Sequence, residues 1–152
     1  MRTYPYRQAL ASAQAKMEKE AASRWKLSAL ILDARAAELR GKPKDAVEAL
    51  RAAVVLDEKE PPSGPAGAVT ARERLGELLL RQQKAGDALV ELRKSLELHP
   101  RRSRSLLGAA RAATLAHDPS ARDYYTQLAA NWSQADADFV GLAEVRQAAA
   151  QH

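Results

Sequence analysis

Apolar residues recur every three or four positions along most of the chain, and no segment alternates between apolar and polar residues. This spacing is typical of amphipathic helices, which turn one face toward a core. Near the N-terminus it predicts a helix at residues 6–23, with Leu10 and Met17 on one face. Near the C-terminus it predicts a last helix at residues 138–150, which Asp138 can cap. We therefore expect an all-α protein.

One apolar pattern occurs twice, and the second copy follows the first at a constant offset of 42 residues. The first copy carries Ala46, Leu50, Ala53 and Val54, and the second carries Ala88, Leu92, Ser95 and Leu96. Asp45 and Asp87 match at the two helix starts, where a carboxylate can cap free N–H groups. The pattern predicts two copies of one helix-turn-helix unit.

The segment 69–102 has small residues where two helices would approach each other and a proline near its end. Gly76 and Ala88 leave room for close contact between the helices, and Leu92 fills the space between them. Pro100 ends the second helix. This arrangement resembles the tetratricopeptide repeat (TPR), a helix pair of about 34 residues.

Two further units, at residues 27–60 and 103–133, resemble the same repeat less closely. In the best unit, Arg72 and Leu79 depart from the family pattern, which has large apolar and aromatic residues there. The resemblance implies a right-handed helical-hairpin solenoid of about three repeats, with N- and C-terminal capping helices, in a single domain over residues 1–152. The extra eight residues of the offset lie in a Pro/Gly-rich stretch, for which we expect an exposed loop at 58–68.

The overall layout is also similar to the C-terminal repeat region of bacterial TPR proteins of unknown function. The segments that carry this likeness are Gly64-Pro65, Glu73 through Leu79, Arg102 through Gly108, and Trp132 through Asp138. The likeness implies no activity.

The TPR resemblance implies that the first helix of each repeat lines a concave groove that holds a partner segment. By register, the groove positions are Ile31, Arg35, Glu38, Thr70, Glu73, Glu77, Leu80, Arg81, Arg104, Leu107, Arg111 and Thr114. These helices lack the Lys and Asn of the two-carboxylate clamp found in chaperone-binding TPRs. The mixture of Arg and Glu suits a protein or peptide of mixed or acidic charge. The alternative interpretation is that these are ordinary solvated helix positions.

The sequence offers little for catalysis. It contains no cysteine, and its three histidines, His99, His117 and His152, form no metal-binding pattern. No phosphate-binding loop or nucleophile motif is present. We therefore expect a protein that is not an enzyme and uses no cofactor or metal.

Charge and aromatic residues leave two further alternatives open. Residues 61–116 carry ten basic and five acidic side chains, while residues 117–152 carry two basic and five acidic ones. The run from Arg101 to Arg104 could bind phosphates, but it lacks interleaved aromatics, so we expect an inter-repeat turn in which Ser103 caps the next helix. The aromatic residues at core-like spacing are Trp25, Tyr124, Tyr125 and Trp132, and we expect them to pack; exposure of either tryptophan would instead indicate an interface.

The favoured hypothesis is a protein-interaction scaffold that binds its partner in the groove. A self-associating homo-oligomer is the alternative, and nucleic-acid binding through the basic middle is a weaker one. The longest apolar stretches, near Leu27–Leu32 and Leu78–Leu80, are too short to span a bilayer. Residues 1–10 show no secretory signal, so we expect a cytoplasmic protein, unless the chain is part of a longer one with its own targeting segment.

Overall fold

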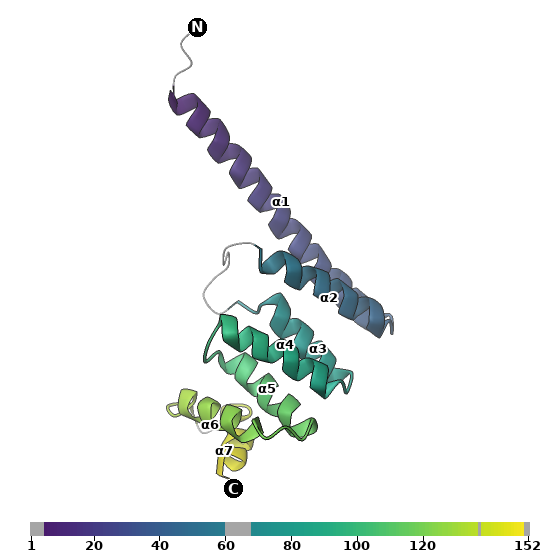
Figure 1. The fold of residues 1–152 in the computed structure, drawn as a ribbon, viewed down its shortest axis with the longest axis vertical. Coiled ribbons are helices and arrows are strands. Elements are labelled where there is room, and N and C mark those ends of the chain that lie inside the picture. Colours follow the sequence, from purple (N-terminus) through teal and green to yellow (C-terminus); the bar gives the residue numbers. More distant parts are fainter. Residues whose placement is uncertain (1–4, 60–67, 137, 151–152) are drawn as a thin grey trace. The chain divides into compact units, whose positions relative to one another are not determined.

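The computed structural model describes residues 5–59, 68–136 and 138–150, and every regular element among them is a helix (Figure 1). The helices are α1 (Pro5–Leu39), α2 (Pro43–Asp57), α3 (Ala71–Arg81), α4 (Ala85–Leu98), α5 (Ser103–Leu115), α6 (Ala121–Asn131) and α7 (Leu142–Ala150). The prediction of an all-α protein is confirmed. Contacts between residues divide the chain into two compact units, residues 1–68 and 69–152, and each is described by itself. Most of the loop predicted at 58–68 falls on residues 60–67, which lie outside the described residues.

Unit 1 is a hairpin of α1 and α2 with a small core. Ala34 and Ala37 of α1 are buried in this unit, as are Ala46 and Leu50 of α2. The apolar spacing predicts a helix at 6–23 and a separate repeat from residue 27, but α1 continues without interruption from Pro5 to Leu39. The predicted break is absent because residues 6–40 contain neither glycine nor proline, and their alanine, leucine, lysine and arginine residues favour helix.

Unit 2 packs each helix against the next in the chain, from α3 through to α7. Leu92 of α4 lies at the centre of this packing and is completely buried. A Cβ atom added to Gly76 of α3 would lie 2.6 Å from Leu92 Cγ, and one added to Gly108 of α5 would lie 3.0 Å from Leu92 Cδ1. The predicted close approach at Gly76, with Leu92 filling the space, is therefore confirmed.

The first helix of each hairpin ends in the same way. Gly41, Gln83 and His117 follow α1, α3 and α5 with φ angles of 68°, 60° and 54°. After each of them, the next backbone N–H donates to a carbonyl five residues earlier, at 2.8–2.9 Å. These bonds run from Lys42 to Ala37, from Lys84 to Leu79 and from Asp118 to Ala113. This left-handed ending provides hydrogen bonds for carbonyls that have no partner within the helix. It recurs 42 residues after Gly41, at Gln83, and 34 residues later at His117.

Several helix starts differ from the prediction. α7 begins at Leu142 and not at residue 138, because Gly141 adopts a φ of 88° and its carbonyl accepts the N–H of Val145 at 3.0 Å. Asp138 therefore does not cap this helix. Ser103 is the first residue of α5 and Arg102 precedes it as the N-cap, without a side-chain capping bond. Asp45 and Asp87 lie in the first turns of α2 and α4, where the N-caps Lys42 and Lys84 likewise make no side-chain capping bond.

The two tryptophans have different environments. Trp132 packs against the core cluster formed by α5, α6 and α7, and its ring meets that of Phe139 edge to face at 4.8 Å between centroids. Trp25 lies on α1 with 78% of its surface exposed, so the prediction that it packs in a core is wrong.

Candidate partner-binding face of unit 2

The predicted groove residues lie in both units. Ile31, Arg35 and Glu38 belong to α1 of unit 1, and the other nine belong to α3, α5 and the residue before α3 in unit 2. Ile31 is half-buried, while Arg35 is exposed and forms an ion pair with Glu38 at 3.5 Å within α1. In unit 2, α3 contacts α5 directly as well as α4, and this places Glu77 of α3 beside Arg104 of α5.

Ion pairs from α5 to α3 and from α5 to α7 define one face of unit 2. Arg104 of α5 binds Glu77 of α3 through two parallel hydrogen bonds, Nε to Oε1 at 2.5 Å and Nη2 to Oε2 at 2.8 Å. Arg111, two turns further along α5, binds Glu144 of α7 in the same way, at 2.9 and 2.6 Å. Half-buried Leu107 lies between the two arginines on the same side of α5. We call this set of five residues, Glu77, Arg104, Leu107, Arg111 and Glu144, the paired-charge face.

The two arginines of this face are fixed yet accessible. Their side chains are 49% and 48% exposed. Each uses Nε and Nη2 for its glutamate, so Nη1 of Arg104 and Nη1 of Arg111 have no hydrogen-bond partner among the described residues. The hydrogen bond to Glu77 raises the pKa of Arg104, and the hydrogen bond to Glu144 raises the pKa of Arg111. Both guanidinium groups therefore carry a permanent positive charge.

Glu144 is held from two sides. Besides its bonds to Arg111, its Oε1 accepts the hydroxyl of Tyr125 at 2.9 Å. The hydrogen bonds from Arg111, followed by that from Tyr125, lower the pKa of Glu144 despite its partial burial. Burial, and then the hydrogen bond to Glu144, raise the pKa of Tyr125, so this phenol stays protonated. Glu144 is not among the groove positions predicted from the register, because α7 lies beyond the third predicted repeat.

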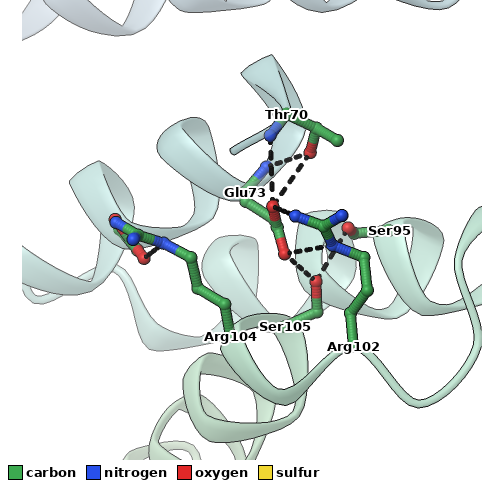
Figure 2. A network of polar contacts seen from close by, with 7 residues as sticks. Thr70, Glu73, Ser95, Arg102, Arg104 and Ser105 are labelled. Atoms are coloured by element: carbon green, nitrogen blue, oxygen red, sulfur yellow. Dashed lines mark hydrogen bonds and ion pairs between the residues drawn. The ribbon is translucent and has the colours of Figure 1, made fainter. Parts of the chain in front are cut away.

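Glu73 does not line a groove, since its side chain is completely buried. Figure 2 shows the polar contacts that surround its carboxylate. Its Oε1 accepts from Arg102 Nε at 2.9 Å and from Ser105 at 2.6 Å, while its Oε2 accepts from Arg102 Nη2 at 2.7 Å. Oε2 also accepts the backbone N–H of Thr70 at 3.1 Å, and Thr70 Oγ1 accepts the N–H of Glu73, which together form a capping box at the start of α3. The Ser105 hydroxyl hydrogen-bonds to Ser95 of α4 at 2.9 Å.

This buried network fastens α3, α4 and α5 together. Burial alone would raise the pKa of Glu73, but hydrogen bonds from Arg102, Ser105 and Thr70 outweigh it and lower the pKa. The spacing Thr70-Ala71-Arg72-Glu73 fits the capping-box pattern, and that pattern is the signal that could have predicted the inward position of Glu73. Arg102 is a structural residue that the register did not single out.

The basic run at the start of α5 is engaged internally. Arg101 Nη2 donates to Asn131 Oδ1 at 3.1 Å, and Asn131 Nδ2 donates to the Arg101 carbonyl at 2.7 Å. Arg102 and Arg104 bind the two glutamates of α3. The predicted turn is confirmed between α4 and α5, and each of these arginines contacts a side chain of its own chain.

The other predicted positions of unit 2 lie near the ends of α3 and α5. Leu80 is half-buried and Arg81 is exposed, both at the end of α3. Thr114 lies one turn after Arg111, and its hydroxyl donates to the Ala110 carbonyl at 2.9 Å. Among the residues that the structure describes, no cluster of three or more His, Asp or Glu could hold a metal ion. In the same residues, no helix is both long and apolar enough to cross a membrane.

No protein-family model matches the chain, and no curated protein matches it significantly.

Proposed function

We propose that the chain is a non-catalytic, TPR-like scaffold that binds a protein segment of mixed or acidic charge on the paired-charge face. The supporting observation is the pair of half-exposed arginines on α5, each fixed by two hydrogen bonds to a glutamate, Glu77 of α3 for Arg104 and Glu144 of α7 for Arg111. The proposal includes a right-handed helical-hairpin solenoid and assigns no reaction to the chain, whose sequence carries no cysteine and no catalytic motif.

The proposed mechanism is preorganisation. A free arginine side chain loses rotamer freedom when it binds, at a cost of about 0.5–1.5 kcal/mol per side chain. On this face the arginines lose that rotamer freedom when the protein folds and not when it binds a partner, because Glu77 and Glu144 already hold Arg104 and Arg111. A guanidinium can bind a second carboxylate through its remaining N–H groups.

The spacing of the arginines defines the partner that this face would take. Arg104 and Arg111 are seven residues apart on α5, which corresponds to about 10 Å along the helix axis. Two acidic side chains at that separation would meet the free Nη1 groups, and an apolar side chain between them would contact Leu107. The flanking Glu77 and Glu144 add carboxylates that would favour basic residues at the edges of the bound segment.

A charge swap tests this proposal without removing the ion pair. The double variant Arg111→Glu/Glu144→Arg keeps net charge and can re-form the pair, but it reverses the pattern that a partner meets. We expect affinity capture from the native lysate to enrich an acidic or mixed-charge protein with the wild-type chain and to lose it with the swapped chain. The captured protein is then titrated directly against both chains.

Arg122→Glu on α6 is the matched control, because Arg122 is exposed and lies outside the paired-charge face. This control is expected to bind as the wild type does. Equal binding by the swapped chain, with helical content unchanged by circular dichroism, would refute the assignment of the function to this face.

A further inference from the structure

Helix α1 carries an exposed apolar stripe along its whole described length. All of its large apolar side chains that are exposed belong to this stripe: Tyr6, Leu10, Met17, Trp25, Leu32 and Leu39, with exposed fractions between 57% and 78%. Within unit 1, α2 covers only the last part of α1, since the buried α1 residues are Ala34 and Ala37 (Figure 1). With 35 residues against 15, α1 is about 50 Å long and α2 about 22 Å.

The stripe is straight and lies on one side of the helix. From Leu10 to Leu39 its members follow each other at intervals of 7, 8, 7 and 7 residues, which matches two turns of 3.6 residues at each step. Ala34 and Ala37 lie on a different side, because neither is at this spacing from the stripe. The hairpin with α2 therefore leaves the stripe uncovered.

We propose that this stripe binds the same stripe of a second copy of the chain, as an antiparallel helix pair centred on Ala21. The inference concerns unit 1 and does not depend on the function proposed for unit 2. The intervals between Leu10, Met17, Trp25 and Leu32 are 7, 8 and 7, so the pattern reads the same in both directions. An antiparallel copy then places Leu10 opposite Leu32 and Met17 opposite Trp25, with Ala21 opposite Ala21.

The side chains at the centre suit this pairing. Alanine at the crossing point allows the helices to approach closely, and a methionine sulfur makes favourable contacts with an aromatic ring. Glu20 and Arg24 lie on one flank of the stripe, one turn apart. A two-fold axis at Ala21 brings Glu20 of each copy within about one turn of Arg24 of the other, which pairs opposite charges.

The paired side chains supply a large part of the area that a stable dimer needs. The exposed fractions of Leu10, Met17, Trp25 and Leu32 amount to about 2.7 fully exposed large side chains, and at roughly 200 Å² for each this is about 540 Å². A standard protein interface buries about 800 Å² on each partner, so these four side chains account for about two thirds of it. Helix α1 carries six basic and four acidic side chains, a mixture closer to a protein interface than to the Lys/Arg-rich polar face of a membrane-binding helix.

The first test is the mass of the full chain in solution, measured by sedimentation or light scattering over a wide concentration range. The wild type is expected at twice its chain mass of 16.6 kDa. Met17→Glu/Trp25→Glu is expected to be monomeric, because it places four carboxylates in the interface. Ser12→Glu/Lys19→Glu is the matched control on the opposite, exposed side of α1, and it is expected to remain dimeric.

The second test determines the orientation and uses the absence of native cysteine. A mixture of Leu10→Cys and Leu32→Cys chains is expected to form a disulfide-linked dimer on mild oxidation, whereas neither variant forms one alone. Cross-linking of each variant with itself would show a parallel pair and overturn the proposed register. A wild-type chain that is monomeric at all concentrations, or a charged variant that stays dimeric with its helical content unchanged, would overturn the proposal.

Discussion

The variant Arg102→Leu tests the account of the buried network most sharply. Glu73 has no solvent contact, and Arg102 supplies two of the hydrogen bonds that compensate its charge. The leucine keeps apolar bulk but leaves a buried carboxylate with only Ser105 and Thr70 as donors. Removing one partner of a buried ion pair typically costs about 3–5 kcal/mol. Because 22% of the Arg102 side chain is exposed, we expect the lower end, about 3 kcal/mol.

Arg104→Leu is the matched control, since it makes the same substitution two residues away. Its ion pair with Glu77 has both side chains partly exposed, at 49% and 27%. Exposed pairs contribute about 0–1 kcal/mol. The two variants should therefore differ by about 2 kcal/mol or more in the free energy of unfolding of unit 2.

The difference in the free energy of unfolding between Arg102→Leu and the wild type should also depend on pH. In the wild type, folding lowers the pKa of Glu73. The stabilisation by its carboxylate is therefore complete above the pKa of Glu73 in the unfolded chain and is lost as the pH falls through the pKa in the folded chain. In the variant, burial would raise the pKa of Glu73 above its ordinary value. The neutral acid is then tolerated at low pH, and the loss of stability relative to the wild type should shrink on acidification.

Urea unfolding followed by tryptophan fluorescence measures these free energies. In a Trp25→Phe background the signal comes from Trp132 alone, which lies in unit 2. Equal losses for Arg102→Leu and Arg104→Leu, or a loss for Arg102→Leu that does not change with pH, would show that Arg102 does not stabilise the buried charge of Glu73.

Three further predictions use single positions of unit 2. Gly76→Ala should lower the free energy of unfolding by about 1–3 kcal/mol, because the added Cβ would overlap the Leu92 side chain of α4. Gly86→Ala adds a Cβ with no atom within 4 Å and should be neutral or slightly stabilising, and urea unfolding measures both variants. His117→Gly should raise the unfolding free energy by about 1 kcal/mol, because a φ of 54° strains a residue with a side chain, and an unchanged denaturation midpoint would argue against this. The pKa of Asp118 is lowered to about 2, first by hydrogen bonds from Ser120, so the stabilisation by ionised Asp118 should be lost only as the pH falls through that value. An NMR titration in which Ser120→Ala leaves the pKa of Asp118 unchanged would contradict this cause.

The packing of unit 2 could be predicted from sequence because a few residue types allow only one arrangement. Gly76 permits an approach that any larger residue would block, and Leu92 is the side chain that occupies the resulting space. The left-handed residue after each first helix also follows the predicted repeat offset, although glycine is present only at Gly41, while Gln83 and His117 adopt the same conformation. At those two positions the hydrogen bonds of the helix end prevail over the backbone preference of the residue.

The candidate site could be predicted only in part. The register predicted helices for Glu77, Arg104 and Arg111, and the structure has these residues on α3 and α5. A register gives no side-chain partners, so it did not predict the ion pair from Arg111 to Glu144 of α7. It also placed Glu73 in the groove, because the repeat pattern does not distinguish an exposed carboxylate from one that turns inward to cap its own helix.

The full length of α1 was not predicted, because the repeat pattern was given more weight than the helix propensity of the residues. The repeat pattern calls for a boundary between residues 23 and 27, but no residue there interrupts a helix. The exposed stripe along α1 could have been noticed from its spacing of seven and eight residues. Sequence alone could not show that α2 covers a different side of α1.

Site-specific photocross-linking on the paired-charge face tests the proposed function most directly. A photoreactive residue is placed at Thr114, which is exposed and lies one turn after Arg111 on α5, and as a control at Gln127, which is exposed on α6. In cells that express the chain naturally, the account predicts a covalent adduct with a protein of acidic or mixed charge from Thr114 and none from Gln127. The same adducts from both positions, or no adduct from Thr114, would contradict binding at this face.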